Sequence, residues 1–410
     1  MTTETVGRGA DSTAGDRRDP LAAADASELF LASPRGTLIA RDAIAAADTT
    51  RLADIAPDAT ELLAGCVRDL SARARASGAP LLVGAVPFAA EAAARLVVAR
   101  DIEWAPRLSG VRRGAVPKAV RVDLVPWPDR YTASVERAMA RLTGKHKVVL
   151  ARAIDVITAE PARAGELARS LVCGEPDAYV FAVPVGTQRS GARRVLVGAS
   201  PELVVRRAGR SVVSNPLAGS VPRSSDPVED RERAAQLLHS RKDLHEHRIV
   251  VEAVADALRP LCAALEVPAT PSVLHTSTMW HLSTQVRGVL RDPRTNALEL
   301  AAALHPTPAV CGWPTDAARR LIAEAEAFDR QFYCGLTGWM NAAGDGEWVL
   351  ALRCAEVADT RMRLYAGAGV VEGSAPAAEL AETSAKFRTF LAALGLDPAV
   401  AVDPSAVRAK

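Results

Sequence analysis

The sequence predicts an α+β fold with large antiparallel β-sheets. After residue 145, β-branched runs come at short intervals, and such runs bounded by turn residues are typical of strands. Only a few helical patterns lie between these runs, and long successions of strands favour an α+β architecture. No repeat with a period of about 20–50 residues is visible, so a repeat architecture is not indicated.

The first 141 residues predict a tail followed by alternating strands and helices. Residues 1–20 are polar and too poor in apolar side chains to bury a surface, so we expect a disordered tail there. We expect one domain over residues 21–400. The periodicity predicts strands at 37–40 and 81–88 and Ala-rich helices at 60–76 and 89–99.

The remainder of the chain predicts two long helices among many strands. The helices are expected at 227–265 and 376–394. The strands are expected at 147–156, 178–185, 194–197, 203–207, 211–214, 273–277, 282–290, 332–339, 347–357 and 362–366.

Composition excludes several classes of protein. Hydrophobic residues make up 49% of the 410 residues, and the formal net charge is only +2, so we expect a globular protein without a nucleic-acid or membrane partner. The six cysteines form no C-x-x-C pair, which argues against a zinc site and a disulfide framework. The N-terminal residues contain no apolar stretch of signal-peptide length, and we therefore expect a cytoplasmic protein.

Carboxylates on the two predicted helices are candidate metal ligands. Glu246 has Ile249 and Val250 at i+3 and i+4, which places it on the apolar, inward side of its helix. On the last helix, Glu379, Glu382 and Lys386 share one face. Carboxylates of this kind suit Mg2+. Spacing alone favours another interpretation, in which Glu382 and Lys386 form an exposed ion pair and Glu246 caps its helix or pairs with a nearby arginine.

Other candidate residues are equally ambiguous by themselves. Gly367-Ala368-Gly369 follows a predicted strand, where backbone amides can approach an anion, but such a motif is more often a turn. Lys147 opens an apolar strand, where lysine is usually a solvated edge residue. Glu202 follows a proline and by default lies in a surface turn. His245 and His247 are two residues apart, which does not place both rings on one helical face for zinc.

Many segments, in this order, resemble the chorismate-utilising enzymes, a family that includes isochorismate synthase, salicylate synthase and the large subunit of anthranilate synthase. The resemblance spans residues 141–394. It rests on Lys147-Val-Val-Leu-Ala-Arg152, Gly198-Ala-Ser-Pro-Glu-Leu203, Asn215-Pro-Leu-Ala-Gly-Ser220, Lys242-Asp-Leu-His-Glu-His247, Met279-Trp-His-Leu-Ser283, His305-Pro-Thr-Pro-Ala-Val-Cys-Gly312, Phe332-Tyr-Cys-Gly335, Gly346-Glu-Trp-Val349, Leu352-Arg353, Ala366-Gly-Ala-Gly-Val370 and Glu382-Thr-Ser-Ala-Lys386.

The resemblance implies packed antiparallel sheets with outer helices and assigns roles to individual residues. Lys147 matches the base that activates water for attack at C2 of chorismate, and Glu202 matches the acid that protonates the departing C4 hydroxyl. An amine acts as a base only when neutral, and an acid must keep its proton near neutral pH. We therefore expect Lys147 to be desolvated or near another cation, and Glu202 to be buried. Glu246 and Glu382, with Glu379 beside them, match ligands of Mg2+.

The resemblance also implies a substrate pocket. Arg353 matches the arginine that pairs with the enolpyruvyl carboxylate, and Lys386 is expected near the ring carboxylate. The other residues expected to bind substrate are Gly219, Ser220, His281, Ala309, Tyr333, Gly367, Ala368 and Gly369.

Within the family, two residues favour isochorismate synthase. Ala218 stands where the aminodeoxychorismate enzymes carry a lysine nucleophile, so water or ammonia attacks C2. Ala309 stands where salicylate synthases tend to carry threonine. Salicylate synthase and an anthranilate synthase-like, amine-transferring enzyme stay open as alternatives, as does a binding protein without activity. We expect a monomer without a glutamine amidotransferase subunit. Its product is expected to supply siderophore synthesis, with menaquinone and salicylate as the other destinations.

Overall fold

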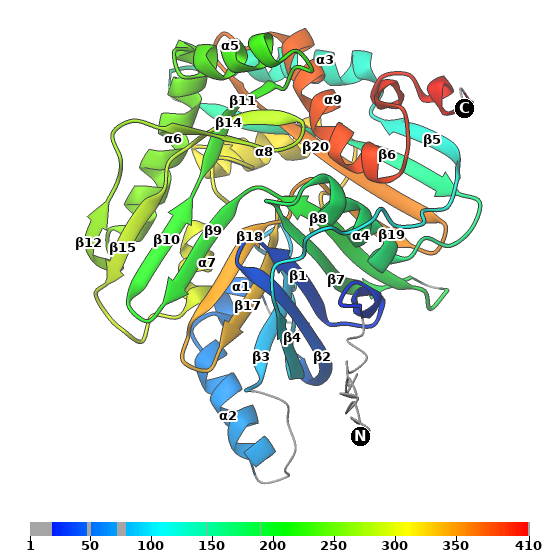
Figure 1. Ribbon diagram of the computed structural model, residues 1–410. Coiled ribbons are helices and arrows are strands. Elements are labelled where there is room, and N and C mark those ends of the chain that lie inside the picture. The colour runs from blue at the N-terminus through cyan, green and yellow to red at the C-terminus, as the bar shows by residue number, and fades with distance from the viewer. Residues whose placement is uncertain (1–18, 47–50, 72–78, 145, 189, 409–410) are drawn as a thin grey trace, which may run out of the picture.

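The computed structural model describes residues 19–46, 51–71, 79–144, 146–188 and 190–408. Most of the expected tail, residues 1–18, lies outside the described residues. Within the described part of the chain, seventeen strands form one large sheet and three strands form a small one. Figure 1 shows how the strands and helices are arranged. This is the α+β fold with extensive antiparallel pairing that the sequence predicts.

The large sheet is one continuous antiparallel ladder. Its strands, from one edge to the other, are β12 (Cys262–Glu266), β15 (Val286–Leu290), β10 (Ser211–Asn215), β9 (Leu203–Ala208), β18 (Gly346–Leu350), β17 (Leu336–Asn341), β3 (Leu81–Val86), β4 (Arg95–Ala105), β2 (Gly36–Ala46), β1 (Leu29–Ser33), β7 (Tyr179–Thr187), β8 (Arg193–Ser200), β19 (Cys354–Ala358), β20 (Arg361–Val371), β6 (Lys147–Thr158) and β5 (Ala119–Val125). The two-residue strand β16 (Gly312–Trp313) pairs with the start of β6.

Two short links make this ladder fold back on itself. A short link joins β8 to β9, and another joins β18 to β19. The two strands that each link joins are far apart in the strand order of the ladder. The links are hydrogen-bonded to opposite strands: Ala199 N donates to Arg353 O at 3.1 Å, and Leu350 N donates to Glu202 O at 3.1 Å. Glu202 and Arg353 therefore lie where the two halves of the sheet meet.

Burial on both faces follows from this folding. Successive side chains of a strand point to opposite faces, and in β1 Leu29 and Leu31 join one hydrophobic core while Phe30 and Ala32 join the other. All five residues of β1 are buried. A strand buried on both faces has no polar alternation, and this is why β1 was not predicted.

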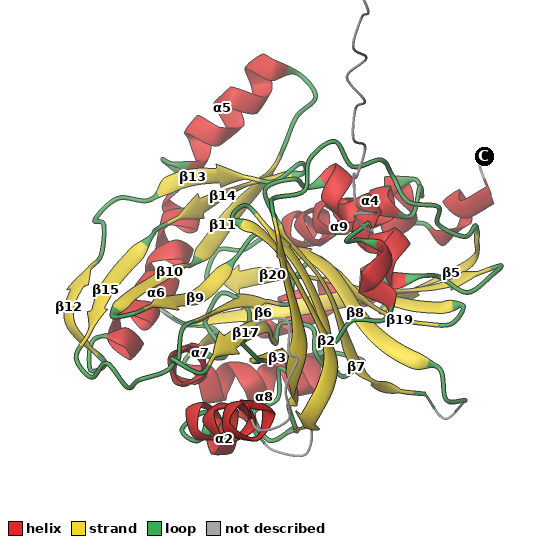
Figure 2. Ribbon diagram, turned by 60° about the horizontal axis from the view of Figure 1, so that its bottom comes forward, coloured by secondary structure: helices red, strands yellow, loops and turns green. Residues whose placement is uncertain are grey.

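Helices cover both sides of the large sheet. Figure 2 shows α4 and α9 on one side and α2, α7 and α8 on the other. The helices are α1 (Leu52–Ile55), α2 (Ala59–Ser71), α3 (Pro128–Met139), α4 (Ala164–Gly174), α5 (Pro227–Leu237), α6 (Arg241–Leu258), α7 (Ala297–Leu304), α8 (Thr315–Ala325) and α9 (Pro376–Ala393), with short 3-10 turns at Ala22–Asp25, Pro398–Ala401 and Pro404–Arg408.

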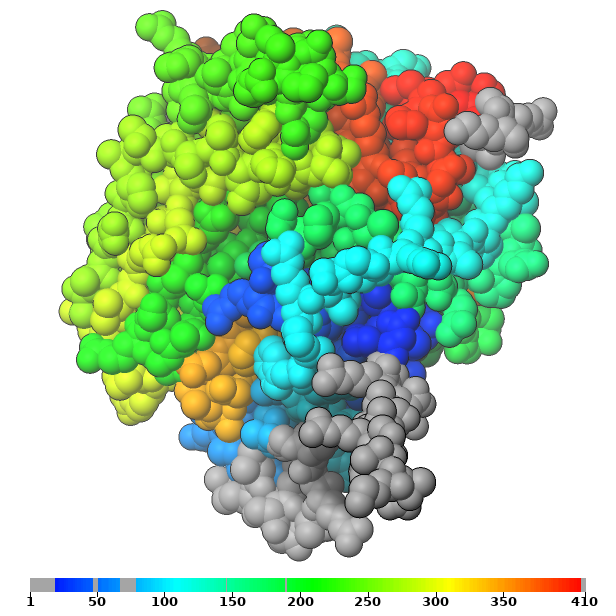
Figure 3. All heavy atoms as spheres, in the orientation of Figure 1, coloured from blue at the N-terminus to red at the C-terminus, as the bar shows by residue number. Residues whose placement is uncertain are grey.

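The segment of residues 106–118 crosses the surface over α4, and it is drawn in cyan in Figure 3. Gly114 N donates to Ser170 Oγ at 3.1 Å, and Ala115 N donates to Glu166 Oε2 at 2.8 Å. None of the described helices is long and apolar enough to cross a membrane.

The small sheet has the order β11 (Leu217–Pro222), β14 (Met279–Ser283) and β13 (Ser272–His275). Its first two strands pair antiparallel, with Ser220 opposite His281. This sheet corrects the prediction of one strand over 282–290. Leu282 belongs to the small sheet, whereas β15 belongs to the large one, because the chain changes sheets between them.

Three further predictions of elements were wrong. The expected helix 89–99 does not form: residues 89–94 are a turn and an irregular segment, and residues 95–99 begin strand β4, where Val97 and Val98 pair with neighbouring strands. The expected helix 227–265 divides at Ser240, whose hydroxyl caps α6 by accepting from Asp243 N, and its end is strand β12. The expected strand 347–357 is interrupted at Arg353, whose φ is 48°.

Two strands also have boundaries that differ from the prediction. Residues 332–335 form a turn before β17, with a φ of 64° at Cys334, and so are not part of the strand expected at 332–339. Gly367-Ala368-Gly369 lies inside β20, opposite β6, and is not a turn after a strand. The final helix agrees with its predicted range.

Candidate active site

A cavity of about 630 Å³, its open mouth included, lies between the folded-back sheet, the small sheet and helices α6 and α9. Twelve of the fifteen residues that were expected to form the site line this cavity. They are Glu202, Gly219, Ser220, Glu246, His281, Ala309, Tyr333, Arg353, Gly367, Gly369, Glu382 and Lys386. Ala368, between two lining glycines of a strand, does not line the cavity, and Lys147 and Glu379 lie behind its wall.

Glu202 is a buried carboxyl group on the link between β8 and β9. Burial raises the pKa of Glu202 to about 8, although a hydrogen bond from Leu217 N and the charges of Lys147 and Lys386 act in the opposite direction. The bond from Leu217 N reaches Glu202 Oε1 at 3.2 Å. Glu202 therefore holds a proton at neutral pH and can donate it into the cavity. The prediction that Glu202 lies in a surface turn is wrong, because its side chain is buried.

Lys147 begins β6 and is fully buried, so it is not a solvated edge residue. Its Nζ lies 2.9 Å from Glu246 Oε1, but no hydrogen bond with acceptable angles satisfies this buried ammonium group. Gly369 makes room for the pair, because a Cβ at that position would lie 2.2 Å from Glu246 Oε1 and 3.0 Å from Lys147 Cε. The amine of Lys147 thus contacts Glu246, which lines the cavity.

Glu246 faces inward from α6, as its helical spacing predicts. Burial acts to raise its pKa, but the charge and close contact of Lys147, together with the charges of Lys242 and Lys386, outweigh this effect and hold the pKa of Glu246 below its usual range. Glu246 is therefore ionised at neutral pH.

Two further lysine–glutamate pairs surround the same wall. Lys242 Nζ on α6 lies 2.7 Å from Glu379 Oε1 on α9. Lys386 Nζ lies 2.6 Å from Glu382 Oε1 and donates to Gly367 O at 2.8 Å. The pair of Glu382 and Lys386 is the ion pair that spacing favoured, but both side chains are largely buried and line the cavity.

The glutamates do not converge on one point in this structure. Among the described residues, no three His, Cys, Asp or Glu side chains are close enough together to hold a metal ion. Each of Glu246, Glu379 and Glu382 is turned toward a lysine instead. Burial, followed by the charge of Glu382, raises the pKa of Glu379.

Arg353, the last residue of the link between β18 and β19, is buried and lines the cavity. Arg353 Nη2 lies 3.1 Å from His281 Nε2, and Ser220 Oγ lies 2.7 Å from His281 Nδ1. Arginine only donates, so His281 Nε2 accepts and Nδ1 carries the proton. Burial, with the charge of Arg353, holds the pKa of His281 well below its usual range, so this imidazole is neutral.

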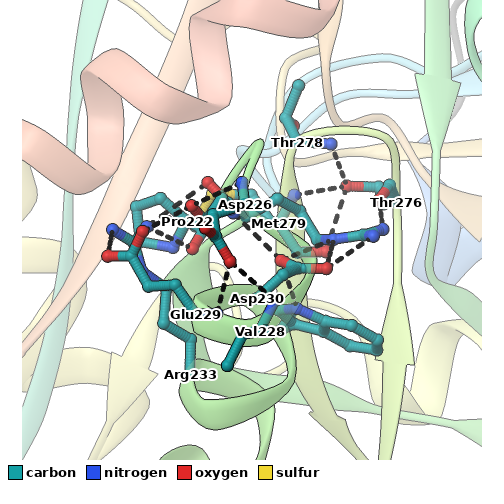
Figure 4. Close-up of polar contacts among 12 residues, drawn as sticks. Pro222, Asp226, Val228, Glu229, Asp230, Arg233, Thr276, Thr278 and Met279 are labelled. Carbon is teal, nitrogen blue, oxygen red and sulfur yellow. Dashed lines mark hydrogen bonds and ion pairs between the residues drawn. The ribbon is translucent and has the colours of Figure 1, made fainter.

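A cluster of charged residues holds the small sheet against α5, as shown in Figure 4. The buried carboxylate of Asp230 accepts hydrogen bonds from Arg223 Nε at 2.9 Å, Ser224 N at 2.9 Å and Trp280 Nε1 at 3.0 Å. The guanidinium of Arg223 lies 4.6 Å from the centre of the Trp280 ring. Because Trp280 precedes His281, the cluster fixes one wall of the cavity.

Some residues of the site were not assigned by sequence reasoning. Lys242 stands in a segment that carries the family resemblance, at i−4 from Glu246, and this spacing was the available signal. Thr278 and Thr389 approach Arg353 Nη1 at 3.4 and 3.5 Å, and Thr389 also donates to buried Glu175 at 3.0 Å. Thr278, Thr389 and Glu175 come from distant segments, and no local sequence pattern predicts their contacts.

Comparisons with known proteins agree with this geometry. The sequence profile of the family described as "Chorismate binding enzyme" matches residues 107–395. The isochorismate synthase DhbC of Bacillus subtilis is 50% identical over 381 residues, which cover 90% of this chain and 94% of that protein. The isochorismate synthase EntC of Escherichia coli K12 is 40% identical over 337 residues, covering 80% and 85% of the two chains.

A solved structure from Bacillus anthracis, described as a 2,3-dihydroxybenzoate-specific isochorismate synthase, superposes with a TM-score of 0.83. It is 44% identical and covers 91% of this chain and 97% of its own. The profile match, the two relatives and this structure place the chain in the family of chorismate-binding enzymes.

Proposed function

We propose that the chain is an isochorismate synthase, which adds water to C2 of chorismate while the hydroxyl at C4 leaves. The observation that carries the proposal is a buried, protonated Glu202 that lines the cavity, with the buried amine of Lys147 behind the cavity wall. A proton donor and a buried amine at one cavity suit a reaction that both takes and gives a proton. Relatives that are similar over about nine-tenths of the chain are named isochorismate synthases.

The proposed reaction needs one proton transfer at each end of the ring. Lys147, in its neutral form, accepts a proton from water as the bond from the water oxygen to C2 forms. The ring double bonds shift, and the bond between C4 and its oxygen breaks. Glu202 donates its proton to that oxygen, which leaves as water. Exchange with solvent restores the proton of Glu202 and removes that of Lys147.

Mg2+ is the cofactor that we propose, with Glu246 and Glu382 as ligands and Glu379 beside them. The donors are carboxylate oxygens, which Mg2+ prefers, and Gly369 leaves room for Glu246 on the side of the sheet. Because each of these glutamates contacts a lysine, its side chain would have to turn away from that lysine to bind Mg2+. When bound, Mg2+ would neutralise a substrate carboxylate and orient the ring between Lys147 and Glu202.

Arg353 and Lys386 are proposed to bind the two carboxylates of chorismate. Arg353 Nη2 contacts His281, and Nη1 contacts Thr278 and Thr389. The N–H groups that these contacts leave free would bind the enolpyruvyl carboxylate. Lys386 would keep its charge next to Glu382, at the end where the ring carboxylate lies.

Ala218 and Ala309 support isochorismate as the product. Both line the cavity, and neither offers an amine nucleophile or a hydroxyl group. An amine-transferring activity and elimination of pyruvate are the competing outcomes. Because the relative from Bacillus anthracis is described as 2,3-dihydroxybenzoate-specific, we propose that the isochorismate supplies a siderophore of the dihydroxybenzoate type.

The test is to incubate the purified protein with chorismate and Mg2+ and to separate the products chromatographically. Isochorismate as the sole product is expected. Salicylate with pyruvate would replace the proposal by salicylate synthase, and anthranilate in the presence of ammonium would replace it by an amine-transferring enzyme. Omission of Mg2+ by chelation is expected to abolish product formation.

A further inference from the structure

The three lysine–glutamate pairs of the cavity wall differ in how easily they can separate. The Lys147 side chain has no exposed surface and is held between Glu246 and the backbone of Gly369. Lys386 has 18% of its side chain exposed, and the carbonyl oxygen of Gly367 holds its ammonium group. The side chain of Lys242 is 34% exposed, and its ammonium group contacts Glu379.

Lys242 lies in the first turn of α6, one turn before Glu246, and reaches across to α9. Its partner Glu379 is almost completely buried. A buried carboxylate without a counter-charge is costly, and Glu382 adds a second negative charge on the same face of α9. Lys242 therefore stabilises the two helices while the carboxylates have no other cation.

We propose that Lys242 is the exchangeable counter-ion of the metal site: it neutralises Glu379 in the metal-free protein, and its ammonium group moves into solvent when a divalent cation binds. This inference rests on the proposed Mg2+ site. Its exposed position allows Lys242 to leave without burying a charge elsewhere, which the positions of Lys147 and Lys386 do not allow. Lys242 accordingly competes with the cation and sets the affinity of the site.

Removal of this competitor has a defined direction. The ion pair of Lys242 and Glu379, with 2.7 Å between Nζ and Oε1, has to break before the cation can take its place. Without the ammonium group, no ion pair has to break before a cation approaches Glu379. We expect the Lys242→Met variant to bind Mg2+ at least about tenfold more tightly than the natural protein. The same variant is expected to melt at a lower temperature in a chelating buffer and to regain its stability when Mg2+ is added.

The experiment measures the Kd of Mg2+ by isothermal titration calorimetry on full-length protein without substrate. Lys118→Met is the matched control, because it removes the same charge from an exposed position before β5. Lys242→Arg keeps the charge and is expected to retain the Kd of the natural protein. If Lys242→Met does not fold, Lys242→Gln is measured in its place.

An unchanged or weaker affinity in Lys242→Met, with normal binding in the natural protein, would overturn the role of Lys242 and leave the Mg2+ site standing. Equal tightening in Lys118→Met would overturn it as well, because a general effect of charge would then be responsible. If the natural protein binds no Mg2+ at all, the proposed metal site fails, and the counter-ion role fails with it.

Discussion

Replacement of Glu202 by glutamine is expected to remove activity and to increase stability at alkaline pH. Glutamine keeps the oxygen that accepts from Leu217 N, so the packing of the link between β8 and β9 should survive. It has no acidic proton to donate, and loss of a general acid typically lowers a rate by about 10²–10⁴. In the natural protein, kcat should fall as the pH rises through about 8, because Glu202 then loses its proton.

The gain in stability follows from the same pKa. The unfolded chain releases this proton near pH 4.5, whereas the folded protein keeps it until about pH 8. The folded state therefore binds more protons in this interval, and its stability falls as the pH rises. At about 1.4 kcal/mol per pH unit, the natural protein loses on the order of 5 kcal/mol between pH 4.5 and 8 from this group. The advantage of Glu202→Gln should grow by about 3 kcal/mol from pH 6 to pH 9.

Urea unfolding of both proteins at pH 6 and pH 9 measures this difference, and contributions from other titrating groups cancel. Chromatographic separation of products measures the rate. Glu347→Gln is the matched control: burial also raises the pKa of Glu347, but this residue does not line the cavity. The control should gain stability with pH and keep its activity. Near-normal turnover of Glu202→Gln, or a stability difference independent of pH, would refute the reasoning.

Four further outcomes are expected. Lys147→Ala should form isochorismate at least about 100-fold more slowly, and near-normal turnover would remove Lys147 from the role of base. Arg353→Lys should raise KM for chorismate about tenfold with a smaller change in kcat, because lysine lacks the fork for bidentate binding; a change confined to kcat would contradict this. Asp230→Asn should lower the midpoint of urea unfolding and weaken chorismate binding, since Asp230 anchors the strand that bears His281. If the midpoint and the affinity for chorismate both stay unchanged, the cluster around Asp230 does not fix that wall of the cavity. Mg2+ and chorismate should each lower the Kd of the other by the same factor in calorimetric titrations of Lys147→Ala, whereas independent constants would show that the two sites are not coupled.

The sequence was most informative where one element alone determines the direction of a side chain. Glu246 could be placed inward because Ile249 and Val250 mark the apolar side of its helix. The range of α9 and the shared face of Glu382 and Lys386 followed in the same way. The sequence could not show that this face of α9 borders a cavity, because helical phase does not reveal which part of the protein packs against the helix.

The links between strands were beyond local reasoning. Glu202 looked like a turn residue and Arg353 like the middle of a strand, since their burial comes from two halves of a sheet that meet only after folding. The φ of 48° at Arg353 is unusual for a residue with a side chain and is not visible in its neighbours. The family resemblance supplied these two positions, whereas Glu175 became visible only through its contact with Thr389 of a distant segment.

Charge balance links the separate observations about the cavity. The wall already contains equal numbers of opposite charges, in the pairs Lys147–Glu246, Lys242–Glu379 and Lys386–Glu382. Chorismate carries two carboxylates and Mg2+ two positive charges, so the two ligands together add no net charge to a buried site. Either ligand alone leaves charges that burial makes costly. The charges of the wall therefore predict that metal and substrate each strengthen the binding of the other. Lys242 is the most exposed of the three lysines, and its ammonium group is the one that the metal can displace.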